Sequence, residues 1–205
     1  MRRAVLAKAD LTVAHKRDHH RLRALLAQTD WELLRSSPMP VLLVKGGRYR
    51  PRAPVLAAVD PLHANAKAVD LDKGILRNAA LLAVALKAPI HAVQVSPAWA
   101  TSEADPRVLM TALTRASRIK PARMHLLTGI PDLLLAKTAR RLHAGVVVLG
   151  MMSRRGLKRF FLGNTAERLL DDLHCDLLIV KPRQFRSHIV RARRGIYYYS
   201  NLPMA

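Results

Sequence analysis

The 205-residue sequence has a single cysteine, no long apolar run and few acidic residues, and each shortage excludes a class of protein. Cys175 has no partner for an internal disulfide, so a disulfide-stapled secreted domain is excluded and a reducing compartment is expected. No apolar run approaches the roughly 18 residues that a membrane-spanning helix needs. The opening residues, MRRAVLAKADLTV, interrupt their apolar stretch with Lys8 and Asp10, unlike a secretory signal. We therefore expect a cytoplasmic protein that does not enter a membrane.

The shortage of acidic residues leaves a net charge of +21, which commonly indicates a nucleic acid or an anionic surface as partner. Most of this charge lies at the ends of the chain. Residues 1–53 contain 12 basic and 4 acidic residues, and residues 181–205 contain 6 basic and none acidic. The last segment has no sustained periodicity, so we interpret residues 183–205 as a disordered basic tail. The alternative is nucleic-acid binding through the basic flanks, with three consecutive tyrosines stacking on bases.

Between these ends, short apolar runs alternate with segments of helical periodicity. The predicted strands are residues 54–60, 89–96, 122–129, 146–150 and 176–182, and the predicted helices are residues 71–88, 102–119, 131–145 and 164–175. Parallel strands need long crossover connections, which these helices supply. The pattern therefore predicts a doubly wound α/β fold, in which helices cover both faces of a five-stranded parallel sheet.

An internal repeat indicates two related modules. Residues 9–45 parallel residues 144–181, with one residue inserted in the second copy. Counted back from the repeat, Met1 falls within a helix, so the first module is expected to lack the counterparts of its first three strands. The predicted division is a half-module at residues 1–45, a linker at 46–53, a complete module at 54–182 and the tail at 183–205.

The turn between the fourth strand and the following helix has the composition of an anion-binding loop. Two residues separate Gly150 from Ser153, and nine residues separate Ser153 from Gly163, which Asn164 follows. Glycines leave room for an oxygen-rich ligand, and the amides at a helix N-terminus favour phosphate. Alternatively, the glycines only permit the turn and Asn164 only caps the helix. The predicted phosphate contacts are the amides of Asn164 and Thr165 and the side chains of Arg154 and Arg155.

This stretch resembles the universal stress protein family. Members carry, after their fourth strand, two glycines three positions apart and, ten positions later, a third glycine followed by Ser or Thr. The segments AAVD in the first strand and DLLIVKP after the last helix extend the resemblance over residues 54–182, and the repeat is similar to that of members with tandem modules. The resemblance implies a Rossmann-like fold with strand order 3-2-1-4-5, and a site for ATP at the carboxyl ends of the strands.

The resemblance also implies which residues meet the nucleotide. Asp60 matches the family's acidic residue near the nucleotide, although it could be only a turn residue, and Val95 matches the position whose backbone meets adenine. Ser153 stands in place of the middle glycine, and Leu62 in place of a small polar residue, so a vestigial site is the alternative. The predicted nucleotide-binding residues are Asp60, Val95, Gly150, Ser153, Gly163, Asn164 and Thr165, with no metal ion required.

The first module lacks this site. His15, Asp18 and Ala27 stand at its three loop positions, where close approach of a phosphate is disfavoured. The segment HKRDHH offers histidines without a cysteine pair or the spacing of a zinc site. No general base lies next to a hydroxyl nucleophile in either module, so no catalytic residues are predicted.

The resemblance implies an ATP-binding stress-response protein that supports survival under stress or DNA damage, and the residues predict no enzyme activity beyond slow ATP hydrolysis. Its modules are expected to pair antiparallel through their last strands, in a homodimer or within one chain, because an apolar edge is normally paired. The pairing residues are Val41, Leu42 and Leu43 against Leu177, Leu178 and Ile179. The alternatives are an interaction or apolar-ligand protein with a vestigial nucleotide site, and a charge-driven nucleic-acid binder.

Overall fold

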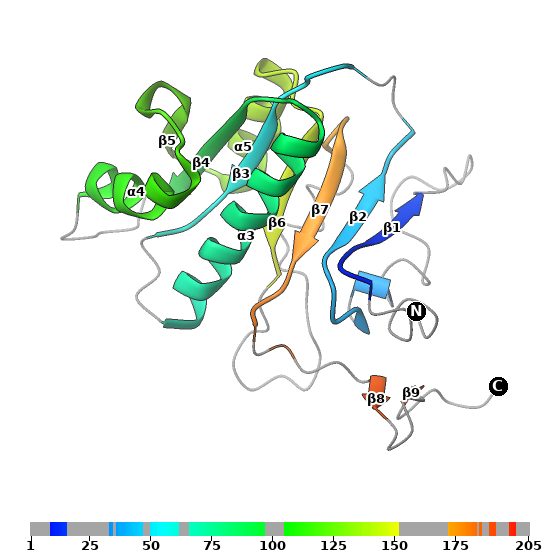
Figure 1. The fold of residues 1–205 in the computed structure, drawn as a ribbon. Helices are drawn as coiled ribbons and strands as arrows, with labels where there is room; N and C mark the ends of the chain where they lie inside the picture. Colours follow the sequence, from blue (N-terminus) through cyan, green and yellow to red (C-terminus); the bar gives the residue numbers. More distant parts are fainter. Residues whose placement is uncertain are drawn as a thin grey trace.

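A computed structural model of the chain has one seven-stranded sheet that runs through both modules (Figure 1). The described residues are 9–15, 33–34, 36–46, 50–61, 66–96, 105–151, 172–183, 185, 189–191 and 197–199. The strands of this sheet are β1 Thr12–His15, β2 Val41–Val44, β3 Val55–Ala58, β4 Ile90–Ser96, β5 Met124–Thr128, β6 Val146–Gly150 and β7 Asp176–Val180. They lie in the order β1-β2-β7-β6-β3-β4-β5.

Strands β3 to β7 form the parallel part of the sheet. Their order is β5-β4-β3-β6-β7, which is the 3-2-1-4-5 order expected from the sequence. Val55, Leu56 and Ala57 of the central strand β3 are completely buried. A strand in the middle of a parallel sheet is covered on both faces, so it is a continuous apolar run in the sequence.

Strands β1 and β2 extend this sheet beyond the five strands predicted. β1 pairs parallel with β2, and β2 pairs antiparallel with β7, so that Val41, Leu42 and Leu43 lie opposite Ile179, Leu178 and Leu177. This is the antiparallel contact that the apolar character of the two segments indicates, and it occurs here within one chain. The sheet is therefore seven-stranded because neither last strand remains an exposed apolar edge.

The helices cover the two faces of the sheet, as the alternating directions of the side chains along β3 show. Val55 and Ala57 point to one face, where α3 Ala66–Ala85 and α4 Pro106–Thr114 pack, and Leu56 points to the other, where α5 Pro131–Arg141 packs (Figure 1). No described helix is long and apolar enough to cross a membrane.

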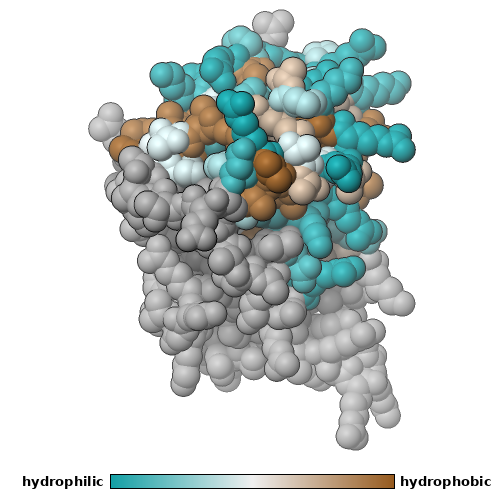
Figure 2. Space-filling view, turned by 90° about the vertical axis from the view of Figure 1, so that its left-hand side faces the viewer, coloured by the Kyte–Doolittle hydropathy of each residue, from teal (hydrophilic) through white to brown (hydrophobic). Residues whose placement is uncertain are grey.

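Helix α4 is shorter than the predicted helix at residues 102–119. Asp105 caps it, since its Oδ1 accepts a hydrogen bond from the Arg107 amide at 2.8 Å, and Pro106 fills the first turn. Two short 3₁₀ turns, η1 Arg115–Ser117 and η2 Pro121–Arg123, then lead into β5. The surface on this side of the molecule mixes hydrophilic and hydrophobic residues (Figure 2), so a single apolar residue such as Val108, 64% exposed, is ordinary there.

The described residues of the predicted tail include two short strands. These strands, β8 Ile189–Arg191 and β9 Tyr197–Tyr199, pair antiparallel in a separate two-stranded sheet. Isoleucine, valine and tyrosine favour extended backbone, which accounts for strands at these positions despite the missing periodicity.

Candidate functional site

Three of the predicted nucleotide-binding residues lie along one edge of the sheet. Gly150 ends β6, Val95 is the next to last residue of β4, and Asp60 follows the end of β3 by two residues. These strands are neighbours in the order β6-β3-β4 and run parallel, so their carboxyl ends meet at the same edge. After β3 the chain adds β4 and β5 on one side and then crosses to β6 on the other, which makes this the point where strand order reverses.

Asp60 is held in place by a contact to helix α3. Its amide donates a hydrogen bond to Oδ1 of Asp72 at 3.1 Å, and Asp72 is only 5% exposed. One residue earlier, the Val59 amide donates to the Val93 carbonyl at 3.0 Å, which ties the end of β3 to β4. The backbone at Asp60 is therefore fixed between a helix and a neighbouring strand.

Asp72 was not among the residues predicted from the sequence. A signal for it exists, because Asp72 shares helical spacing with Leu76, Ala79 and Ala83, all of which are buried. An acidic residue on an apolar helical stripe needs a polar partner inside the protein. The Asp60 amide at the strand end is that partner.

Val95 has polar neighbours along β4. It is half-buried and lies opposite Leu127 of β5. The adjacent Gln94 is only 1% exposed, and its Nε2 donates a hydrogen bond to Ser96 Oγ at 3.1 Å. Within the described part of the chain, Gln94 Oε1 is a buried acceptor without a hydrogen-bond partner. A buried glutamine in the run PIHAVQVS was the available sequence signal for this polar pair.

Gly150 is required by packing rather than by backbone conformation. The glycines with positive φ in the described residues are Gly46 and Gly129. A Cβ atom on Gly150 would lie 2.6 Å from Cδ2 and 2.8 Å from Cγ of Leu71, closer than side-chain atoms approach. Gly150 is therefore needed because α3 crosses directly over the end of β6, and not because the backbone there takes a positive φ.

The remaining predicted contacts lie outside the described residues. These are Ser153, Arg154, Arg155, Gly163, Asn164 and Thr165. They follow Gly150 directly in the chain, and the Met151 amide, which donates to the Val180 carbonyl at 2.8 Å, holds the start of the loop at the same sheet edge.

Two histidines form a pair on the face of the sheet that α5 covers. His91 of β4 and His125 of β5 stack with ring centroids 5.3 Å apart, and His91 Nδ1 lies 3.0 Å from His125 Nε2. Burial, followed by the charges of His125 and Arg123, lowers the pKa of His91. Burial, followed by the charge of Arg141, lowers the pKa of His125. Among the described residues, no three His, Cys, Asp or Glu side chains are grouped so that they could hold a metal ion.

Cys175 precedes β7 and is partly buried. Burial raises the pKa of its thiol to about 11, against the smaller opposing effect of Lys45. The thiol is therefore protonated at neutral pH and is a poor nucleophile, in agreement with the buried, unreactive cysteine that its position at the start of a strand indicates.

The profile of the universal stress protein family matches residues 53–181, a range that contains β3 to β7. The chain belongs to the universal stress protein family. It is 34% identical over 200 residues to Universal stress protein E of Salmonella typhi, and 33% identical over 204 residues to Universal stress protein E of Escherichia coli. Each alignment covers 88% of this chain and 63% of the relative, so the chain spans less than two thirds of the length of these relatives.

Solved universal stress protein structures have the same fold. A structure from Pseudomonas aeruginosa, 31% identical, superposes with a TM-score of 0.76, and one from Archaeoglobus fulgidus, 18% identical, with a TM-score of 0.66. Both comparisons cover 88% of this chain and 66% of the other. The coverage exceeds one universal stress protein module, so the likeness includes the β1–β2 half as well as β3 to β7.

Proposed function

We propose that the chain binds a nucleotide, ATP in particular, at the carboxyl ends of β3, β4 and β6. The observation that carries the proposal is the position of Asp60, Val95 and Gly150 on three neighbouring parallel strands. Ligands of open parallel sheets bind at this edge, where strand order reverses. The spacing of Gly150, Ser153 and Gly163, with its match to the family pattern, supports phosphate binding by the loop that follows β6.

Each residue has a role in this proposal. The backbone at Val95 meets the adenine, and Asp60 faces the nucleotide from the neighbouring strand. Gly150 brings the loop close to α3, and the amides of Asn164 and Thr165 donate hydrogen bonds to the phosphates at the N-terminus of the helix predicted for residues 164–175, where the helix dipole favours negative charge. Arg154 and Arg155 add cations for a triphosphate.

The proposed role is that of a stress-response module in the cytoplasm that acts through assembly and partner contacts rather than through catalysis. Pairing of modules by their last strands, within one chain or between two chains, provides the assembly. ATP is turned over slowly or not at all, since neither module has a general base beside a nucleophile. By its likeness to the E-type relatives, we infer a role in survival under stress or DNA damage.

Titration calorimetry with ATP tests the nucleotide site. Gly163→Asp is expected to abolish binding, because it introduces a carboxylate where the phosphates lie. Ser153→Gly is expected to tighten binding by about 5- to 30-fold, if a Cβ at that position is strained by the bound loop. The matched control is Asp105→Asn on α4, which keeps a good helix cap and should leave the affinity unchanged.

The other functions predicted from the sequence give different results in the same experiments. Absence of ATP binding by every folded variant would support a vestigial site and contradict the proposal. Nucleic acid in the mass spectrum of the natively purified protein, with binding that weakens steeply with salt and disappears when residues 183–205 are removed, would support the charge-driven alternative.

A further inference from the structure

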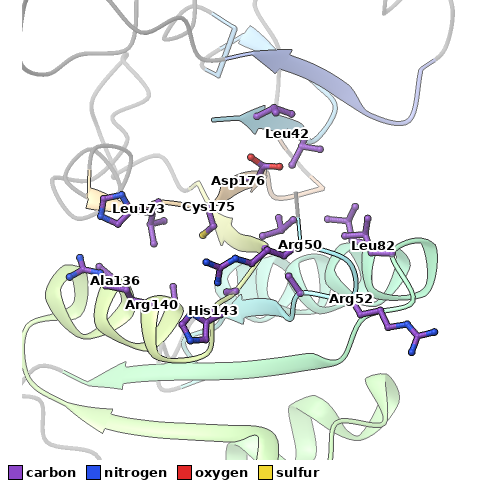
Figure 3. Close-up of a pocket in the computed structure, with 18 of the residues that line it drawn as sticks. Leu42, Arg50, Arg52, Leu82, Ala136, Arg140, His143, Leu173, Cys175 and Asp176 are labelled. Atoms are coloured by element: carbon purple, nitrogen blue, oxygen red, sulfur yellow. The ribbon is translucent and has the colours of Figure 1, made fainter. Parts of the chain in front are cut away.

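A cavity of about 470 Å³ opens at the amino ends of the strands, opposite the proposed nucleotide site (Figure 3). Its lining includes Ala53, Gly145 and Cys175, which lie just before β3, β6 and β7. The five residues of β6 separate this edge from Gly150 by about 15 Å. The cavity is therefore distinct from the nucleotide site.

Backbone contacts and a close approach build the floor of this cavity. The Gly145 amide donates a hydrogen bond to the Pro54 carbonyl at 2.9 Å, and the Asp176 amide donates to the Gly145 carbonyl at 3.1 Å. A Cβ on Gly145 would lie 2.9 Å from that of Ala53, so the two chain segments touch. The strand starts thus form a fixed surface rather than a loose loop cluster.

The walls of the cavity are apolar and come from both modules. Leu82 and Leu86 lie at the end of α3, Ala139 lies on α5, and Leu42 and Val44 belong to β2. Both helix ends therefore contribute, one from each face of the sheet. Because β2 lies in the first half of the chain, the cavity is complete only when β2 is paired with β7.

The rim of the cavity is mainly cationic. Arg50 and Arg52 precede β3, and Arg140 with His143 closes the end of α5. In Figure 3, Arg50 reaches into the space between β7 and α5, whereas Arg52 points away from it. The acidic residues of the lining are Asp172 and Asp176. Asp176 Oδ1 accepts a hydrogen bond from the Lys45 amide at 2.9 Å, which orients this carboxylate toward the end of β2, and the lining as a whole holds three arginines against these two carboxylates.

We propose that this cavity binds an organic anion with an apolar body, such as a medium-chain carboxylate. Its volume lies within the range of small-molecule sites, which are mostly apolar with a few fixed polar groups. The leucines and alanines exclude water from the apolar body. The planar guanidinium of Arg50 pairs with a carboxylate through two parallel hydrogen bonds. This function goes beyond nucleotide binding and uses none of the residues of that site.

Calorimetry of the full chain with octanoate tests the charge requirement. Octanoate is expected to bind, whereas octylammonium, which has the same chain and the opposite charge, is not. Arg50→Gln should weaken octanoate binding about tenfold or more, because it removes a charge-assisted contact. Arg107→Gln is the matched control, since Arg107 is exposed on α4 and does not line the cavity. Equal binding of the two probes, or no binding of octanoate, would overturn the proposal.

Two adjacent leucines of α3 test the location. Leu82 lines the cavity, whereas Leu81 is 62% exposed and does not. Leu82→Gln should therefore weaken octanoate binding, and Leu81→Gln should not, with circular dichroism confirming that both variants fold. Saturating ATP should leave the octanoate affinity unchanged. Displacement of octanoate by ATP, or equal affinities of both leucine variants, would overturn this location, whereas failure of ATP to bind would affect only the nucleotide proposal.

Discussion

The β1–β2 half and the β6–β7 half of the sheet are built alike. Each is a parallel pair, the last strand of each is followed by a lysine, and the two halves join antiparallel. The lysine that follows the last strand of each half binds to the other half. Lys45 Nζ donates a hydrogen bond to the Leu173 carbonyl at 2.6 Å, and Lys181 Nζ donates to the Ser37 carbonyl at 2.6 Å. Each lysine Nζ thus satisfies a carbonyl near the last helical turn before the other half's final strand.

The halves differ at the end of the first strand of each pair. Gly150 ends β6, where α3 passes too close for a side chain, and His15 ends β1. His15 is exposed, and its Nε2 would lie 3.1 Å from a Cβ on Gly46. We call the antiparallel contact between β2 and β7 the joint. The lysine hydrogen bonds at the joint are present in both halves, whereas the glycine is present only where a helix packs over the strand end.

The largest effect is expected at the joint itself. Leu43 and Leu177 lie opposite each other across β2 and β7, and both are completely buried in one shared core. Leu43→Ala and Leu177→Ala should each lower the free energy of unfolding by about 2–5 kcal/mol, since each leaves a cavity. Denaturant titration measures this loss. The double variant should cost less than the sum, because the two side chains share one environment.

Val13→Ala is the control for the joint. Val13 lies on β1 and is 60% exposed, so its truncation should change stability by less than about 0.5 kcal/mol. A Leu43→Ala variant as stable as the unmodified protein would show that the β1–β2 half adds nothing to the stability of the second module, and the two halves would then not form one core.

The contrast between Gly150 and His15 gives the next largest effect. Gly150→Ala should destabilise by about 1–3 kcal/mol, because its Cβ overlaps Leu71. The matched control is Gly74→Ala in α3, whose Cβ would meet Val180 at an ordinary 3.5 Å and which should stabilise the helix by about 0.5–1 kcal/mol. Thermal unfolding of both variants and of Gly150→Ala with Leu71→Ala checks the origin of the loss. If Leu71→Ala does not recover part of it, the overlap is not the cause.

The sheet could be predicted from the sequence because its signals are local. Apolar runs such as Val146–Gly150 and the repeat that ends at Lys45 and Lys181 indicate strands, crossovers and an apolar edge that must pair. The partners of individual side chains gave no such signal, even where, as at Asp72, the helical spacing indicates that a polar partner is needed. The hydrogen bond from Asp60 to Asp72 depends on how α3 lies over the sheet. Likewise, the segment at 46–53 was predicted as a linker, and its arginines line a cavity only because β2 lies beside β7.

The lysine exchange is expected to make stability depend on alkaline pH. Burial lowers the pKa of Lys181 from 10.5 to about 7, so between these values the unfolded chain binds a proton that the folded chain does not. Stability is therefore lost as the pH falls from about 10.5 to 7, with a slope of at most about 1.4 kcal/mol per pH unit. Lys181→Met should flatten this slope in urea titrations, whereas Lys137→Met, at an exposed position of α5, should not. Identical slopes of stability against pH for Lys181→Met and the unmodified protein would mean that the joint keeps Lys181 charged.

The smallest effect is expected from the His91–His125 pair, which belongs to the second module alone. Both pKa values lie below 6.5, so the unfolded chain takes up protons first, and stability is lost as the pH falls below about 6.5 toward the lowered values. Both rings are only partly buried, so solvent weakens the charge effects and the loss should be small. His91→Phe keeps a stacked ring without a titrating group. It should flatten the loss of stability below about pH 6.5, the acid limb, and leave unchanged the loss between about pH 10.5 and 7 that Lys181 causes, the alkaline limb. The two limbs then report separately on the second module and on the joint. An acid limb that persists in His91→Phe and in His125→Phe would assign it to other groups, and an alkaline limb altered by either variant would show that the two regions do not act independently.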